Sequence, residues 1–152
     1  MPLHTYHQIA GKELASAESP FDWRLLPLKH HDDPSQIRTY GFVRFLTPTG
    51  DTHLLSMAFL SDQSLFELSI FANLDSVNEE IRSLAMSTTL DSHVSFYAPV
   101  AKSDMWMICE SRTSWGAGGR IATNQQFWDL ETGALLMSCS QDAVVSPPKP
   151  LL

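Results

Sequence analysis

The segment His53-Leu-Leu-Ser-Met-Ala-Phe-Leu-Ser-Asp-Gln-Ser-Leu-Phe-Glu-Leu-Ser-Ile-Phe-Ala72 is the longest apolar-rich run without Gly or Pro, and it is too long for an ordinary strand. Its apolar residues recur at helical spacing, and further apolar residues lie on its other sides. The stripe at helical spacing consists of Leu54, Met57, Ala58, Leu65 and Leu68. This pattern is typical of a helix that other structure surrounds. We therefore predict one long central helix around which the chain folds.

Asp62 is the first candidate site residue because it interrupts this helix. It lies one turn after Ala58 and just before Leu65. Its carboxylate would then share the apolar stripe, where an unpaired charge is costly. The other interpretation is that Ser61 and Asp62 mark a helix break or cap and that the acid faces water. Periodicity favours neither interpretation.

Length and charge limit the class of protein. The chain has 152 residues, the size of one domain, and a hydrophobic content of 43%, which is enough for a core. With 10 basic and 17 acidic residues, its formal charge is -7. It offers no long basic face to neutralise phosphates, so nucleic acid is not an expected partner. An anionic ligand would need local basic residues.

The two cysteines, Cys109 and Cys139, lie in strand-like segments and match no zinc-binding spacing. Since the polar start of the chain is unlike a secretory signal, we expect reduced thiols that pack in the core of an intracellular protein. The charged residues of the predicted helix exclude it as a membrane span. No metal or redox cofactor is expected.

Strand-like runs flank the predicted helix. Two short runs, at residues 21–26 and 39–47, precede it, and four longer runs follow it. The longer runs are residues 86–97, 104–115, 120–130 and 134–145. They predict an antiparallel meander, and the whole pattern predicts an α+β fold in which one curved sheet wraps the helix. We expect residues 1–19 to form an N-terminal arm, 20–146 the domain and 147–152 a proline-rich tail.

Two strand positions are further candidates. In the last run Gln141 shares its parity with Cys139 and Ala143, so it points to the apolar face, where its amide must find partners. It is either a structural amide or one that orients a water or a carbonyl. Thr89 has the parity opposite to that of its apolar neighbours unless a bulge changes the register. By composition alone it is an ordinary strand residue.

Three other constellations do not predict a site. Asp91, Ser92 and His93 have the residue types of a hydrolase triad, but consecutive strand residues point to alternate faces. The chain also has no Gly-x-Ser-x-Gly motif. The run Gly116–Arg120 lacks the Walker lysine and lies between two strands, which favours a hairpin turn. His30–Asp33 lies among turn formers with no further ligand pattern, which favours a solvated loop over a metal site.

Several short motifs, taken in order, resemble the second half of the acyl-CoA thioesterase II family. They are Pro20-Phe-Asp-Trp-Arg24, Met57-Ala-Phe-Leu-Ser-Asp62, Thr89-Leu-Asp91, Gly118-Gly-Arg120 and Ser138-Cys-Ser-Gln-Asp142. The resemblance runs from residue 20 to residue 145. It implies a single hot-dog fold, a curved antiparallel sheet wrapped around one long central helix. The family has two such folds in one chain.

The resemblance also implies an activity, the hydrolysis of acyl-CoA thioesters in lipid metabolism. In the family an Asp, a Thr and a Gln hold the attacking water, and the matching positions here are Asp62, Thr89 and Gln141. Backbone amides would polarise the thioester carbonyl. The implied localisation is intracellular, either cytoplasmic or peroxisomal, although the chain ends in Pro150–Leu152 rather than in Ser-Lys-Leu.

This sequence departs from the family pattern near two of these positions. The family has His directly after Leu-Asp, whereas this chain has Ser92 there and His93 one position later, on the opposite strand face if the register holds. The family commonly has an arginine soon after the Gln, and Ala143–Ser146 contains none. The altered Ser92–Tyr97 segment and the match to only one repeat of the family keep open a noncatalytic or repurposed hot-dog protein that binds an acyl or polyketide-like ligand. A dehydratase or cyclase is a third possibility.

Two further expectations concern how a substrate is held. Contacts to the CoA phosphates are expected from Arg112, Arg120 and Lys102, each of which would otherwise be a solvated surface charge. Since only the second repeat of the family is matched, we expect a second copy of the chain to take the place of the first repeat in a homodimer. A partner chain carrying the first repeat would serve equally well.

Overall fold

The computed structural model describes residues 20–26, 38–46, 53–63, 86–98, 102–117 and 119–146, which form six strands and one helix. The elements are β1 (Phe21–Leu25), β2 (Arg38–Phe45), α2 (His53–Gln63), β3 (Met86–Phe96), β4 (Met107–Ala117), β5 (Arg120–Asp129) and β6 (Leu135–Ser146). The predicted order of two strands, a helix and four strands is confirmed. Predictions for the arm and the proline-rich tail fall outside the described residues, as does the 64–72 part of the predicted helix.

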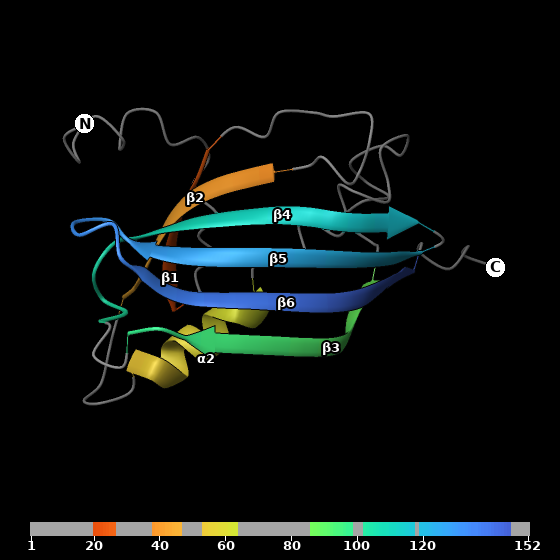
Figure 1. Cartoon of the computed structure of the whole chain (residues 1–152), viewed down its shortest axis with the longest axis horizontal. Helices are drawn as coiled ribbons and strands as arrows, with labels where there is room; N and C mark the ends of the chain where they lie inside the picture. Colours follow the sequence, from red (N-terminus) through yellow and green to blue (C-terminus); the bar gives the residue numbers. More distant parts are fainter. Residues whose placement is uncertain are drawn as a thin grey trace.

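The six strands form one sheet in the order β1-β2-β4-β5-β6-β3, and every pairing is antiparallel. Figure 1 shows β4, β5 and β6 side by side, with β3 along one edge. The prediction of a four-strand meander is therefore wrong for β3, which pairs with β6 rather than with β4. The reason is the length of the connection, because residues 97–106 separate β3 from β4. A tight hairpin uses far fewer residues.

One face of the sheet, which we call the inner face, carries α2. The alternation of burial along β5 identifies this face, where Ile121, Thr123, Gln125 and Phe127 are buried. Met57 and Leu60 of α2 belong to the same buried cluster as Phe127. Because strand side chains alternate between faces, the residues of β6 with the parity of Gln141 also face inward, as the sequence predicts.

The helix is covered on one side only. Ser56, Met57, Leu60 and Ser61 are buried, whereas Leu55 is 72% exposed and Phe59 is 52% exposed. The predicted stripe is wrong for Leu54 and Ala58, which are also exposed. The described helix lies on a single sheet, and a sheet face covers one side of a helix. An apolar side of α2 is therefore left uncovered by the described residues.

Both cysteines are free and buried on the inner face, as predicted. The Cys139 thiol lies 3.1 Å from Gln125 Oε1, and the Cys109 thiol lies 3.4 Å from Ser111 Oγ. Burial raises the pKa of each thiol to about 12. Neither thiol is therefore a nucleophile at neutral pH.

The turn between β5 and β6 is built around one carboxylate. Asp129 Oδ1 accepts hydrogen bonds from Glu131 N (3.0 Å), Thr132 N (2.6 Å) and Thr132 Oγ1 (2.8 Å). Gly133 follows with a φ of 69°, a left-handed conformation that favours glycine. The hydrogen bond from the Thr132 N–H lowers the pKa of Asp129, with the Thr132 hydroxyl and the Glu131 N–H adding to the effect. The charged carboxylate therefore stabilises the turn.

Replacing Asp129 by Ala is expected to lower the free energy of unfolding by about 1 to 2 kcal/mol at pH 7, because three donors lose their acceptor. The pKa of Asp129 is lower in the folded chain than in the unfolded chain. The stabilisation is therefore complete above about pH 4 and is lost as the pH falls through the folded pKa. Denaturant unfolding between pH 3 and 7 measures this difference. Glu131→Ala, in the same turn, is the control, and an equal loss in both variants would contradict the assignment.

Candidate active site

Gln141 is the centre of the candidate site. It lies on the inner face of β6, is 4% exposed, and stands opposite Thr123 of β5 and Ser92 of β3. Its Nε2 donates a hydrogen bond to Ser92 Oγ at 3.1 Å. Its Oε1 is buried and has no hydrogen-bond partner among the described residues. The amide thus presents an open acceptor in the interior, where an unpaired polar atom is unfavourable.

Gln141 belongs to a polar row that crosses four strands. The register aligns Thr113 of β4, Thr123 of β5, Gln141 of β6 and Ser92 of β3. The hydroxyls of Thr113 and Thr123 are also buried without a partner among the described residues. Sequence reasoning missed both threonines, although Thr123 has the parity of the buried Phe127. This part of the inner face can therefore hold a hydrogen-bonding ligand or water.

Thr89 joins this face because of a β-bulge. The register between β3 and β6 shifts between Thr89 and Asp91, so that Thr89 stands opposite Ala143 of the inner face. Without the shift, Leu90 would occupy that place, and Leu90 is instead 53% exposed. Ala143 is two residues from Gln141 on the same strand, so Thr89 is a diagonal neighbour of Gln141. The sequence analysis allowed for a bulge that changes the register of Thr89, and this bulge is present.

Asp62 lies near the end of α2 and is exposed. The interpretation that places its carboxylate within a buried apolar stripe is therefore wrong, because the buried side of the helix ends at Leu60 and Ser61. The preceding Ser61 carbonyl lies 4.0 Å from the Cys139 thiol of β6. Cys139 is two residues from Gln141 on the inner face. The end of α2 that carries Asp62 thus lies over the part of β6 next to Gln141.

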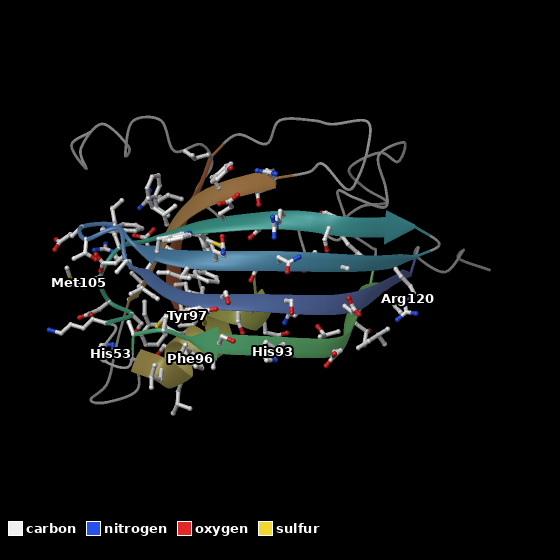
Figure 2. The ribbon with its side chains drawn as sticks, viewed as in Figure 1. His53, His93, Phe96, Tyr97, Met105 and Arg120 are labelled. Atoms are coloured by element: carbon white, nitrogen blue, oxygen red, sulfur yellow. The ribbon has the colours of Figure 1, made fainter. Side chains whose placement is uncertain are left out.

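Ser92 and His93, where this chain departs from the family pattern, lie on opposite faces of β3, as predicted. Ser92 faces inward and bonds Gln141, whereas His93 stands opposite Ser140 on the outer face and its Nε2 lies 3.2 Å from Ser95 Oγ. Figure 2 shows His93 on the edge strand β3. A triad of Asp91, Ser92 and His93 is therefore excluded.

The three basic residues predicted to contact phosphates lie apart. Arg112 and Arg120 are exposed and alternate with the inner-face residues of their strands, so both point to the outer face. Figure 2 shows Arg120 at the opposite end of the sheet from Met105. Lys102 lies at the Met105 end, because its carbonyl accepts a hydrogen bond from Met105 N at 3.3 Å. Of the three, Arg120 lies at the end of the sheet where Thr89 stands.

The described residues contain no group of three or more His, Cys, Asp or Glu that could hold a metal ion. Within the same part of the chain, no helix has the length and hydropathy needed to cross a membrane. The inner face around Gln141 offers an amide and hydroxyls, and the nearby end of α2 carries the exposed Asp62 carboxylate. Together they can bind and orient a water and accept one of its protons.

Comparison with solved structures shows the hot-dog fold. The chain superposes on an acyl-CoA thioesterase II, TesB2, from Mycobacterium marinum with a TM-score of 0.66 and 18% identity, covering 92% of this chain and 58% of that one. For the tesB protein of Mycobacterium avium subs paratuberculosis the TM-score is 0.68, the identity 19%, and the coverage 91% and 54%. The chain thus spans little more than half the length of these two proteins.

A third structure is of similar length. A hypothetical thioesterase from Streptococcus pneumoniae, solved with coenzyme A, matches with a TM-score of 0.62 and 11% identity, over 90% of this chain and 96% of that one. No curated protein matches the sequence. The family model described as acyl-CoA thioesterase C-terminal domain matches residues 5–145. The chain therefore belongs to the acyl-CoA thioesterase C-terminal domain family.

Proposed function

We propose that this protein hydrolyses the thioester bond of an acyl-CoA or a related acyl thioester, with Asp62, Thr89 and Gln141 holding the attacking water. The observation that carries the proposal is the open acceptor Gln141 Oε1, which lies buried on the face to which the bulge brings Thr89. Membership of the thioesterase domain family supports the reaction type. The coenzyme A in the structure of the Streptococcus pneumoniae protein, which has a similar fold, supports the carrier by analogy.

The reaction needs a base for one proton of water. In the proposed mechanism the Asp62 carboxylate accepts this proton while the water oxygen bonds to the thioester carbonyl carbon. Gln141 Oε1 accepts a hydrogen bond from the second water proton, and Thr89 contributes its hydroxyl. Backbone N–H groups stabilise the resulting oxyanion. The carbon–sulfur bond then breaks, and the thiolate takes the proton from Asp62 to give free thiol and acid.

The test is the release of free CoA from a panel of acyl-CoAs of increasing chain length and polarity. We expect turnover with at least one of them that depends on the amount of folded protein. Saturable binding without thiol release would contradict the proposal and favour a noncatalytic acyl-binding protein. That second candidate is supported by the exposure of Asp62 and by Ser92 at the position where the family has His.

A dehydratase or cyclase is less well supported by the site. Such reactions use a histidine or another acid–base pair at the substrate. Of the two histidines in the described residues, His93 points to the outer face, and His53 accepts a hydrogen bond from Ser103 N at 3.1 Å. Neither one stands beside Gln141. Hydrolysis by a bound water needs no histidine, because Asp62 is the proposed base.

The protein is further proposed to act as a homodimer. Two features support this arrangement, the uncovered apolar side of α2 and the edge strand β3, which pairs only with β6 among the described strands. Phe96 and Tyr97, at the end of β3, are also exposed and lie at the His53 end of the molecule (Figure 2). A second copy placed on this side would cover these groups and enclose the exposed Asp62. Another hot-dog domain in the same position is the alternative partner.

Charge reversal of Arg120 tests the proposed phosphate contact. If Arg120 binds a CoA phosphate, Arg120→Glu is expected to raise KM roughly tenfold while kcat changes less than twofold, because the contact is remote from the reacting bond. Arg112→Glu and Lys102→Glu are measured in parallel, and the effect is expected to be largest for Arg120→Glu because Arg120 lies at the end of the sheet where Thr89 stands. Steady-state kinetics with the best acyl-CoA of the panel measures this. An equal KM for Arg120→Glu and the wild type removes Arg120 from the site.

A further inference from the structure

The hydrogen bond between Gln141 and Ser92 anchors the Gln141 side chain against β3. The donor is Nε2 and the acceptor is Ser92 Oγ, at 3.1 Å, and the two residues stand directly opposite each other in the β3–β6 register. A side-chain amide has its donors on one side and its acceptor on the other. With Nε2 held toward β3, Oε1 remains as the group without a partner among the described residues. We propose that Ser92 is a positioning residue that presents Gln141 Oε1 to the reacting water.

Gln141 has a second possible hydrogen-bond partner on its other side. Gln141 lies between Ser92 on β3 and Thr123 on β5. The Thr123 hydroxyl is buried and has no partner among the described residues, so it can accept a hydrogen bond from Nε2 if the amide turns over. In the structure the contact to Ser92 Oγ holds the amide toward β3. Removing the Ser92 hydroxyl therefore allows the amide to rotate.

The orientation has a chemical consequence that rests on the proposed function. A water that attacks a carbonyl carbon donates its protons to acceptors and directs a lone pair at the carbon. Asp62 would accept one proton and Gln141 Oε1 the other. A reversed amide would instead donate its N–H to the water oxygen and compete for that lone pair. Ser92 acts on the reaction through Gln141 and does not itself touch the substrate.

Kinetics of three variants test this role. Ser92→Ala is expected to lower kcat roughly tenfold with KM changed less than twofold, because the water is misoriented while substrate binding is kept. Ser92→Thr retains the hydroxyl and should keep most of the wild-type kcat. Ser95→Ala, in the same strand with its side chain on the outer face, should match the wild type. Ser92 is exposed, so all three variants are expected to fold, and their thermal unfolding midpoints check this.

A second measurement is independent of activity. In protein labelled with 15N at glutamine, the side-chain amide signals of Gln141, identified by their loss in Gln141→Glu, should shift in Ser92→Ala and stay in place in Ser95→Ala. Unchanged Gln141 signals in Ser92→Ala would overturn the proposal. Shifted signals with an unchanged kcat would also overturn it, because the contact would then be only structural. If the wild type hydrolyses no thioester, the proposed function fails, and the amide signals still decide whether Ser92 orients Gln141.

Discussion

Asp62→Asn is expected to lower kcat for acyl-CoA hydrolysis by about 100-fold or more, with a KM within about threefold of the wild type. Asn has the size of Asp and can still hydrogen-bond a water, but it cannot accept a proton from it. The loss therefore isolates the base function from the positioning function. Asp62 is exposed at the end of α2, so the substitution is not expected to change the thermal unfolding midpoint.

The matched control for this variant is Asp142→Asn. Asp142 directly follows Gln141 but is exposed and alternates with the inner-face residues of β6. The same chemical change there should leave kcat and KM unchanged. Thiol release monitored with a chromogenic reagent measures both variants against the wild type, and the buried cysteines will not interfere at neutral pH. Full turnover by Asp62→Asn in a chain whose wild type is active would remove Asp62 from the mechanism.

Leu55→Asp is expected to weaken self-association of the chain at least tenfold. Leu55 is 72% exposed on the uncovered side of α2, so in the isolated chain its side chain contributes little to the fold. In the proposed homodimer the same position is buried against a second copy, where an unpaired carboxylate is costly. Sedimentation or light scattering should give a mass near twice the 17.0 kDa chain for the wild type and a shift toward the monomer for the variant.

Ser140→Asp controls for the added charge. Ser140 is exposed on the outer face of β6, away from α2. This variant should associate like the wild type. If the dimer completes the site around Asp62, Leu55→Asp should also lose activity at concentrations where it is monomeric and regain it at higher concentration. A wild type that stays monomeric at micromolar concentration contradicts the homodimer and favours another hot-dog domain as the partner.

The sequence by itself was sufficient for the order of the elements and for the inward face of the last strand. Side-chain direction in a strand alternates with a period of two, so it can be inferred from the local sequence. Gln141 and Cys139 were placed inward on this basis, and both are buried. The short motifs around them were also sufficient to identify the thioesterase domain family, which the match over residues 5–145 shows.

The tertiary structure decided what depends on pairing between distant segments. Which strand pairs with β3, and where its register shifts, is set by contacts across the sheet, and these alone bring Thr89 to the inner face. The same pairing places Ser92 against Gln141, a contact that neither residue's own neighbours indicate. The exposure of Asp62 likewise depends on how much of α2 one sheet face can cover. Local periodicity predicts the direction of a side chain, but only the pairing of strands in the folded sheet determines which side chain it contacts.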